Sequence, residues 1–357
     1  MNISEIDKNF ALNLVKETDV HWQNALDAPF SLHGVFYDSD GERYARMPEK
    51  IAKSVSDGVH GLSTHTAGGR IRFATDSPYV AIKAVVPSGW VMPHMPITGS
   101  HGFALYENGK FVCRYTNDAP KFVNTGNPLS ALEGIYYAEK AGMREYTLHF
   151  PLYNGVKQLF IGTKTGSVVQ APAPYPCAKK VVFYGSSITQ GGCASRTGND
   201  YQSHLSRWLG FDFINLGFSG NAKAEPTMCE YLADMHADVY VLDYDHNAPN
   251  VAHLQATHTP LYETVRAKNP NAPVLFISRP DWDKDPTCPA RRDVVRKTYE
   301  TAKKNGDKNV WFIDGETLFG ADDRDACTVD TCHPNDLGFY RMAQTIRPVL
   351  AEMLNKA

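Results

Sequence analysis

A serine, a histidine and an aspartate in this chain have the residue types and spacing for nucleophilic catalysis. Ser187 comes directly after Gly185 and Ser186 at the end of an apolar run, and Asp330 precedes His333 by three positions. A serine hydroxyl becomes a good nucleophile when a neighbouring base takes its proton, and that base needs a carboxylate to orient it. At this spacing Asp330 can reach the ring nitrogen of His333 that faces away from the serine. The pattern predicts acyl transfer by a triad of Ser187, His333 and Asp330.

These groups must be positioned by the elements that precede them along the chain. After residue 177, patterns of buried strands alternate with patterns of helices. The expected strands are 180–184, 211–216, 238–243, 272–278 and 309–314, and the expected helices are 200–209, 226–235, roughly 260–268, 291–304 and one from about 335. This alternation predicts a three-layer α/β/α domain with a parallel five-stranded sheet. Catalytic groups in such a sheet lie just past the carboxyl ends of the strands, where the blocks 185–189, 217–221 and 244–247 occur.

The first half of the chain has a different pattern. From about residue 31 to 165 it contains short β-like runs broken by Gly, Pro and Asn, which is typical of a β-sandwich. Asn108-Gly109 lies between two such runs and predicts a hairpin. We expect the first 29 residues to add a helix or an irregular lead-in. The Pro-rich stretch 171–176 is the expected linker between an N-terminal β-sandwich accessory domain (1–175) and a catalytic domain (177–357).

The combination of blocks resembles the SGNH (GDSL-type) hydrolase superfamily over essentially all of 178–357. In that family the first block supplies the nucleophile, here Ser187, and the last block reads D-x-x-H-P, which Asp330 to Pro334 matches. The resemblance also implies an oxyanion hole made of the N–H groups of Ser187 and Gly220 and the side-chain amide of Asn247. The implied fold is flavodoxin-like.

Two blocks depart from the family pattern. Ser186 stands where the family has Asp, and we expect it to be a turn or helix-cap hydroxyl rather than the nucleophile. The third block reads Asp-Tyr-Asp-His-Asn-Ala over 243–248 instead of G-x-N-D. Such departures are found in the branch known as GDSL-like acylhydrolase family 3, whose members carry a preceding jelly-roll-like β-domain with a G-x-D-L-Y signature. The stretch 102–106 matches that signature apart from Ala104, and 151–156 is similar to a second sequence motif of that domain.

The resemblance implies a serine carbohydrate esterase that removes O-acetyl groups from plant-derived manno- or xylo-oligosaccharides and needs no cofactor. Trp90 and Trp282 are candidates for stacking on sugar rings, with burial or ordinary exposure as the alternative for each. Two other functions stay open. One is a lipid or thioester acylhydrolase of the same superfamily, although no long apolar lid segment is present. The other is a non-catalytic carbohydrate-binding protein.

Composition excludes several other classes of protein. With 36 Lys and Arg against 39 Asp and Glu, the net charge of −3 lacks the basic excess that binding to nucleic acid requires. No apolar run approaches the roughly 18 residues needed to span a bilayer. The polar amino terminus does not resemble a signal peptide, so we expect a cytoplasmic protein whose substrates are imported oligosaccharides rather than intact polymers. No pattern in the sequence sets an oligomeric state.

Metal binding is the last alternative that the sequence raises. A group of acidic and histidine residues begins at the end of the third predicted strand and continues into the segment after it, namely Asp243, Asp245, His246, His253 and His258. One strand end and one loop would have to fold all of them onto a single ion, so we expect polar loop residues and no metal site. The seven cysteines are odd in number and contain no C-x-x-C pair, so we expect reduced and mostly buried thiols.

Overall fold

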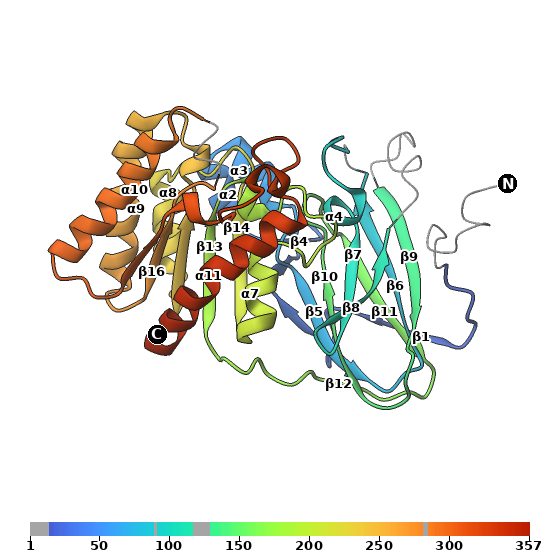
Figure 1. Ribbon diagram of the computed structural model, residues 1–357. Coiled ribbons are helices and arrows are strands. Elements are labelled where there is room, and N and C mark those ends of the chain that lie inside the picture. The colour runs from blue at the N-terminus through green and yellow to red at the C-terminus, as the bar shows by residue number, and fades with distance from the viewer. Residues whose placement is uncertain (1–13, 89–90, 117–128, 281–284) are drawn as a thin grey trace.

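The computed structural model describes residues 14–88, 91–116, 129–280 and 285–357, and Figure 1 shows a β-sandwich beside a layered α/β domain. Trp90 and Trp282 lie outside the described residues. No helix in these four ranges combines the length and the apolar character that a membrane span requires.

Two antiparallel sheets form the sandwich, as the sequence predicts. The first sheet contains, in spatial order, β1 (Val20–Asn24), β11 (Gln158–Lys164), β6 (Tyr79–Pro87) and β9 (Leu129–Tyr137). The second contains β12 (Val169–Gln170), β5 (Arg70–Thr75), β10 (Arg144–His149), β7 (Phe103–Glu107) and β8 (Lys110–Tyr115), with β2 (Ser31–His33) also paired to β5. Inward-facing side chains such as Ile71, Ile82 and Leu148 form the core between the sheets. The short strands β3 (Phe36–Asp38) and β4 (Arg43–Ala45) pair separately.

The hairpin predicted at Asn108-Gly109 joins β7 to β8. Both residues have positive φ, 48° and 77°, which is the backbone that a two-residue turn of type I′ requires. Asn and Gly are the residues that adopt this conformation at the lowest cost, so the turn fixes the register of the two strands.

The beginning of the chain differs from the expectation. The first 29 residues were predicted to add a helix or an irregular lead-in, but Val20–Asn24 form the strand β1, which pairs with β11. Its residues are mostly half-buried because they lie on an edge strand. An edge strand lacks the continuous apolar run of a buried strand, so the sequence pattern here gives little indication of a strand.

Helices within the first half were also missed. The segments α2 (Glu49–Val55), α3 (Asp57–Ser63) and α4 (Ile97–Ser100) interrupt the β pattern. Met47, Ala52 and Val59 do not join the sandwich core but belong to an apolar cluster of the second half of the chain, together with residues such as Met228. Because α2 and α3 bury their apolar faces against the second half of the chain, the two halves share a core across the predicted boundary.

The second half forms the predicted three-layer α/β/α domain. Its parallel sheet has the order β14 (Asp212–Gly217), β13 (Lys180–Gly185), β15 (Val239–Asp243), β16 (Val274–Ile277) and β17 (Val310–Ile313). The helices are α6 (Ser187–Gln190), α7 (Tyr201–Leu209), α8 (Pro226–Asp234), α9 (Val251–Lys268), α10 (Cys288–Lys304) and α11 (Asp336–Lys356), with short 3₁₀ turns η2 (Asp245–Asn247), η3 (Gly315–Thr317) and η4 (Arg324–Cys327). Helices α7 and α11 pack on one face of the sheet, and α8, α9 and α10 on the other (Figure 1).

One helix is longer than the sequence suggested. The prediction placed its start near Pro260, but α9 begins at Val251 and contains Pro260 in its interior. The side chain of Asn250 accepts a hydrogen bond from His253 N and caps the helix there. Proline is favoured in the first turn of a helix, so Pro260 predicts a helix start, whereas the cap lies ten residues earlier.

The register of the sheet brings the candidate blocks to one edge. Gly185 at the end of β13 pairs with Gly217 of β14 and with Asp243 of β15. The segments that follow these three residues therefore leave the sheet at the same level, where parallel strands gather functional groups.

Candidate active site

Ser187 is the first residue of α6, directly beyond the end of β13. The hydroxyl of Ser186 accepts a hydrogen bond from Ile188 N at 3.1 Å and caps this helix, so Ser186 is engaged in the turn. Gly185 is required at this turn because a Cβ atom there would lie 2.1 Å from Thr189 Oγ1 and 2.2 Å from Asp243 O. The strand-to-helix turn thus presents Ser187 at the carboxyl edge of the sheet.

The structure brings Ser187, His333 and Asp330 together. Ser187 Oγ lies 2.9 Å from His333 Nε2, and His333 Nδ1 lies 2.7 Å from Asp330 Oδ2. Asp330 Oδ1 also accepts hydrogen bonds from the backbone N–H groups of His333 and Cys332. Partial burial opposes ionisation of Asp330, but the hydrogen bonds from His333 outweigh it and lower the pKa of this carboxyl below its ordinary value. The ionised carboxylate fixes the proton on Nδ1, which leaves Nε2 free to accept the proton of the serine.

The loop that carries Asp330 and His333 is closed by backbone contacts. Val329 N donates to His333 O at 3.0 Å, and Thr328 forms an isolated bridge with Pro334. Thr331 adopts a positive φ of 70°, an uncommon conformation for a β-branched residue, and this turns the chain between acid and base. Asn335 then caps α11 by accepting a hydrogen bond from Gly338 N.

The predicted oxyanion donors lie on neighbouring segments. Asn247 Nδ2 donates to Phe218 O at 2.8 Å, so this side chain lies against the loop that carries Gly220. Gly220 has a φ of +69°, which favours glycine, and no atom lies within 4 Å of where its Cβ would be. Among the hydrogen bonds of the described residues, none engages the N–H groups of Ser187 or Gly220. These donors are available to an incoming oxygen.

Arg46, which the sequence analysis missed, holds the backbone that leads to this loop. The guanidinium is fully buried and lies 4.8 Å from the centre of the Phe218 ring. It donates hydrogen bonds at 2.6 to 3.2 Å to the carbonyl oxygens of Leu62, His65, Asn215 and Gly217. Burial disfavours the charged form and lowers the pKa of Arg46 to about 9. An arginine in a β-like segment carries no sequence signal for this role.

Other residues of the first half reach the nucleophile helix. Tyr153 OH donates to Ser187 O at 3.1 Å. Gln190 of α6 donates to Leu152 O and accepts from Ser219 N, which joins the first half, α6 and the Gly220 loop. The ring of His94, from the segment before α4, has its centre 5.7 Å from that of His333. The β-sandwich half therefore forms part of the wall of this site.

The acidic and histidine residues at the end of β15 and after it are not gathered around one point. Asp243 accepts hydrogen bonds from Thr189 Oγ1 and Tyr201 OH, and complete burial followed by the nearby charge of Asp245 raises its pKa well above the usual range. His253 Nε2 donates to Lys223 O, and His258 is hydrogen-bonded to Thr298. His246 Nε2 lies 3.0 Å from Cys332 Sγ.

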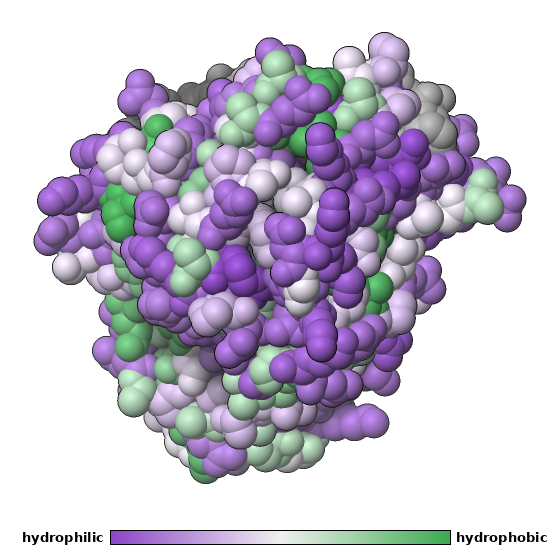
Figure 2. Space-filling model, turned by 90° about the vertical axis from the view of Figure 1, so that its left-hand side faces the viewer, coloured by the Kyte–Doolittle hydropathy of each residue, from purple (hydrophilic) through white to green (hydrophobic). Residues whose placement is uncertain are grey.

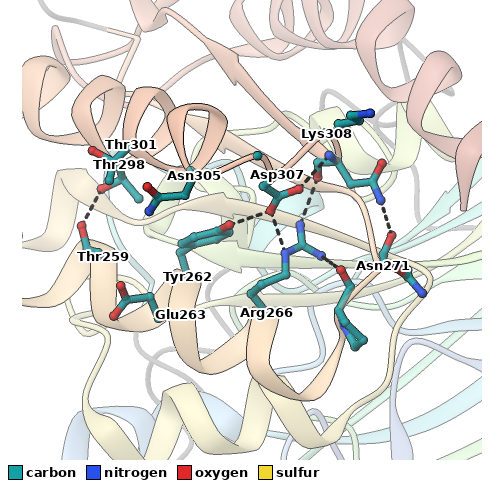
Figure 3. Close-up of a pocket in the computed structure, with 14 residues that line it drawn as sticks. Thr259, Tyr262, Glu263, Arg266, Asn271, Thr298, Thr301, Asn305, Asp307 and Lys308 are labelled. Carbon is teal, nitrogen blue, oxygen red and sulfur yellow. Dashed lines mark hydrogen bonds and ion pairs between the residues drawn. The ribbon is translucent and has the colours of Figure 1, made fainter.

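A separate polar cavity of about 480 Å³ lies between the carboxyl ends of α9 and α10 (Figure 3). This is the amino-terminal edge of the sheet, opposite to Ser187. Asp307 inside it accepts a hydrogen bond from Tyr262 OH at 2.6 Å and forms an ion pair with Arg266 Nε at 2.8 Å. Figure 2 shows that hydrophilic residues prevail on the face formed by these helices.

Two family models match consecutive parts of this chain. The GDSL-like Lipase/Acylhydrolase family matches residues 178–351, and the N-terminus of Esterase_SGNH_hydro-type, named GxDLY, matches residues 20–169. Residues 178–351 belong to the GDSL-like lipase/acylhydrolase family. Both the recognition of this family and the fold predicted from the sequence are confirmed.

Solved structures of the same architecture extend over nearly the whole chain. A protein designated a GDSL-like lipase from Bacteroides ovatus is 29% identical, with a TM-score of 0.82 over 95% of this chain and 99% of that chain. The salicylyl-acyltransferase SsfX3 of a tetracycline biosynthetic pathway is 19% identical, with a TM-score of 0.77 over 95% and 98% of the two chains. An acetyl xylan esterase, Est2A, from the rumen bacterium Butyrivibrio proteoclasticus is 15% identical, with a TM-score of 0.60 over 95% and 99%. A comparison with curated proteins gives no match.

Proposed function

We propose that this GDSL-like family member is a serine carbohydrate esterase that removes O-acetyl groups from acetylated plant-derived oligosaccharides. The observation that carries the proposal is the continuous hydrogen-bond chain from Ser187 Oγ through His333 to Asp330, with links of 2.9 and 2.7 Å. A serine whose proton can pass to an oriented imidazole has the chemistry of acyl transfer.

In the first step, Ser187 Oγ attacks the acetyl carbonyl carbon while His333 Nε2 takes the hydroxyl proton. Asp330 stabilises the imidazolium that results. Hydrogen bonds from the N–H groups of Ser187 and Gly220 and from the side-chain amide of Asn247 stabilise the negative charge on the carbonyl oxygen. His333 then gives its proton to the sugar oxygen, the C–O bond to the sugar breaks, and the acetyl group stays on Ser187.

In the second step, a water molecule takes the place of the sugar. His333 Nε2 accepts a proton from this water, which attacks the acetyl-enzyme through the same oxyanion geometry. The bond to Ser187 Oγ breaks, the proton returns from His333 to the serine, and acetate leaves. These groups suffice for hydrolysis, and no step requires a cofactor.

The choice of a sugar acetate as substrate is supported by the wall of the site and by the architecture. A polar side chain from the β-sandwich half, His94, lies beside His333. A structure that shares this two-part architecture is described as an acetyl xylan esterase. Manno- and xylo-oligosaccharides are the two backbones we propose.

Acetate release from acetylated manno- and xylo-oligosaccharides, followed by mass spectrometry, tests this proposal. Products should lose acetyl groups one at a time with the parent protein and stay intact with Ser187→Ala. Mapping of the positions that lose acetyl would give the regioselectivity.

Assays of other esters and of oligosaccharide binding distinguish the proposed function from the two alternatives. Hydrolysis confined to long-chain acyl esters or thioesters would replace the proposal with a lipid or thioester acylhydrolase. Oligosaccharide binding without ester turnover by the full chain would indicate a carbohydrate-binding protein.

A further inference from the structure

Three metal-ligating side chains from distant parts of the chain meet beside the proposed general base. His94 comes from the segment before α4, Cys193 from the turn after α6, and His333 from the loop before α11. One ligand atom from each of the three lies within 4.8 Å of the others. The mechanism proposed above uses neither His94 nor Cys193.

The position of Cys193 is fixed by the backbone conformation, burial and hydrogen bonding of its turn. Cys193 has a positive φ of 72°, an uncommon backbone for a residue other than glycine, and it is 4% exposed. Gly192 N donates to Ser187 O at 2.9 Å, so this turn is attached to the first residue of α6. The thiol is thereby fixed close to the nucleophile helix, while the side chain of His333 is 20% exposed and open to solvent.

We propose that His94, Cys193 and His333 bind one Zn²⁺ ion and that the bound ion reversibly inhibits the esterase. Zinc favours nitrogen and sulfur ligands in tetrahedral geometry, and three protein ligands with a water molecule in the fourth position form a common arrangement. Zn–N distances of about 2.0–2.1 Å and Zn–S distances of about 2.3 Å place the ligand atoms of a tetrahedral site roughly 3.3–3.6 Å apart.

The hydrogen bonds of His333 determine which of its nitrogens receives the ion. Nδ1 is hydrogen-bonded to Asp330, whereas the hydrogen bond of Nε2 among the described residues is to the hydroxyl of Ser187, which the ion can displace. Zinc ligands of this kind commonly donate their other ring nitrogen to a carboxylate, which orients the ring for the metal. Cysteine binds zinc as the thiolate, so the S–H bond of Cys193 breaks, the S–Zn bond forms, and the proton goes to solvent.

Inhibition follows because zinc occupies the nitrogen that must accept the serine proton. This consequence rests on the proposed esterase function, whereas the binding of the ion does not. While Nε2 is bound to the metal, the hydroxyl of Ser187 has no base.

A second group, Asp330, Cys332 and His333, has similar spacing but is less suited to the ion. The carboxylate of Asp330 already accepts three hydrogen bonds, from two backbone N–H groups and from His333 Nδ1. Cys332 Sγ lies 3.0 Å from His246 Nε2. Cys332 is nevertheless a thiol next to the same histidine, which makes Cys332→Ser a matched control for Cys193→Ser.

The experiment uses the full chain after treatment with a chelator. Zn²⁺ is titrated while hydrolysis of a small aryl acetate is followed, and Co²⁺ is added separately to record its visible and near-ultraviolet absorption. We expect one Zn²⁺ per chain to abolish hydrolysis and EDTA to restore it. The parent and Cys332→Ser should show the thiolate-to-cobalt charge-transfer band, and Cys193→Ser should lack it.

The zinc affinity of the ligand variants decides the assignment. Cys193→Ser and His94→Gln should bind Zn²⁺ at least about 10-fold more weakly than the parent, because loss of even a supporting group typically costs 10–100-fold in metal affinity. Unchanged affinity in both variants would overturn the proposal, and so would loss of the charge-transfer band in Cys332→Ser alone. If the metal-free protein hydrolyses no ester, the proposed function fails, while the cobalt spectrum still decides whether the site exists.

Discussion

Arg46 donates a hydrogen bond to Gly217 O at 2.6 Å, so a residue of the β-sandwich half holds the backbone that leads to the oxyanion loop. The other carbonyl partners of this guanidinium lie in both halves of the chain. The predicted division at 171–176 therefore separates two sequence patterns, but the proposed catalytic geometry depends on contacts across it.

Replacing Arg46 should destabilise the protein and impair catalysis together. Hydrogen bonds that involve charged groups contribute about 1.5–3 kcal/mol each, and Arg46→Met removes several of them. We expect the free energy of unfolding in urea to fall by about 2–4 kcal/mol. The fall is smaller than the sum of the lost hydrogen bonds because the substitution also removes the cost of burying the charged guanidinium. Arg43→Met is the control, since Arg43 forms only partly exposed ion pairs with Asp38 and Glu49, each worth about 0–1 kcal/mol. Equal effects of the two substitutions would contradict this role of Arg46.

Ser187 and Ser186 are adjacent but should respond differently to alanine. Ser187→Ala removes the proposed nucleophile, and we expect kcat for an acetyl ester to fall by about 10³-fold or more. Ser186→Ala removes a helix cap, so we expect a loss of about 1 kcal/mol in unfolding free energy and a much smaller effect on kcat. Steady-state kinetics and urea unfolding of both variants provide the check. A larger loss of kcat in Ser186→Ala than in Ser187→Ala would indicate that Ser186 is the nucleophile.

Asn247 is proposed to bind the oxyanion only as charge develops in the transition state. Removing one such donor typically lowers kcat about 10²–10³-fold, so Asn247→Ala should do so with KM little changed. The kinetic constants for one acetyl ester test this expectation. A rise in KM at constant kcat would instead assign Asn247 to ground-state binding.

Asp243 should make the protein less stable as the pH rises. Its pKa in the folded protein is raised by burial, so between its unfolded pKa of about 3.9 and the higher folded value the folded state binds more protons. Stability therefore decreases as the pH increases through this range. Asp243→Asn keeps an oxygen acceptor for Thr189 and Tyr201 but does not titrate, and we expect it to be more stable than the parent protein at pH 7. Urea unfolding at several pH values measures this, and a steeper loss of stability with pH in the variant would disprove the prediction.

Much of the site could be predicted from the sequence because it is made of local patterns at strand ends. Gly185 to Ser187 follow an apolar run, and Asp330 and His333 lie on one turn, so their neighbourhood is encoded by a few adjacent residues. Parallel pairing then aligns the ends of β13, β14 and β15, which brings Gly220 and Asn247 to the same edge without further information.

The parts that were missed depend on contacts between distant segments. Arg46 and His94 occur in stretches with no motif of their own, and only the packing of the two halves brings them near α6 and His333. Helices α2 and α3 were missed for a related reason, since their apolar residues face a partner that lies over 100 residues further along the chain. Local periodicity does not reveal which domain buries such a face.

Covalent labelling of the nucleophile tests the central claim most directly. The full chain is treated with a serine-directed organophosphonate, and the modified peptide is mapped by mass spectrometry. We predict a single adduct on Ser187, loss of ester hydrolysis in proportion to labelling, and no adduct in His333→Ala, which lacks the base. An adduct on Ser186, or ester hydrolysis that continues after complete labelling of Ser187, would contradict a mechanism based on Ser187, His333 and Asp330.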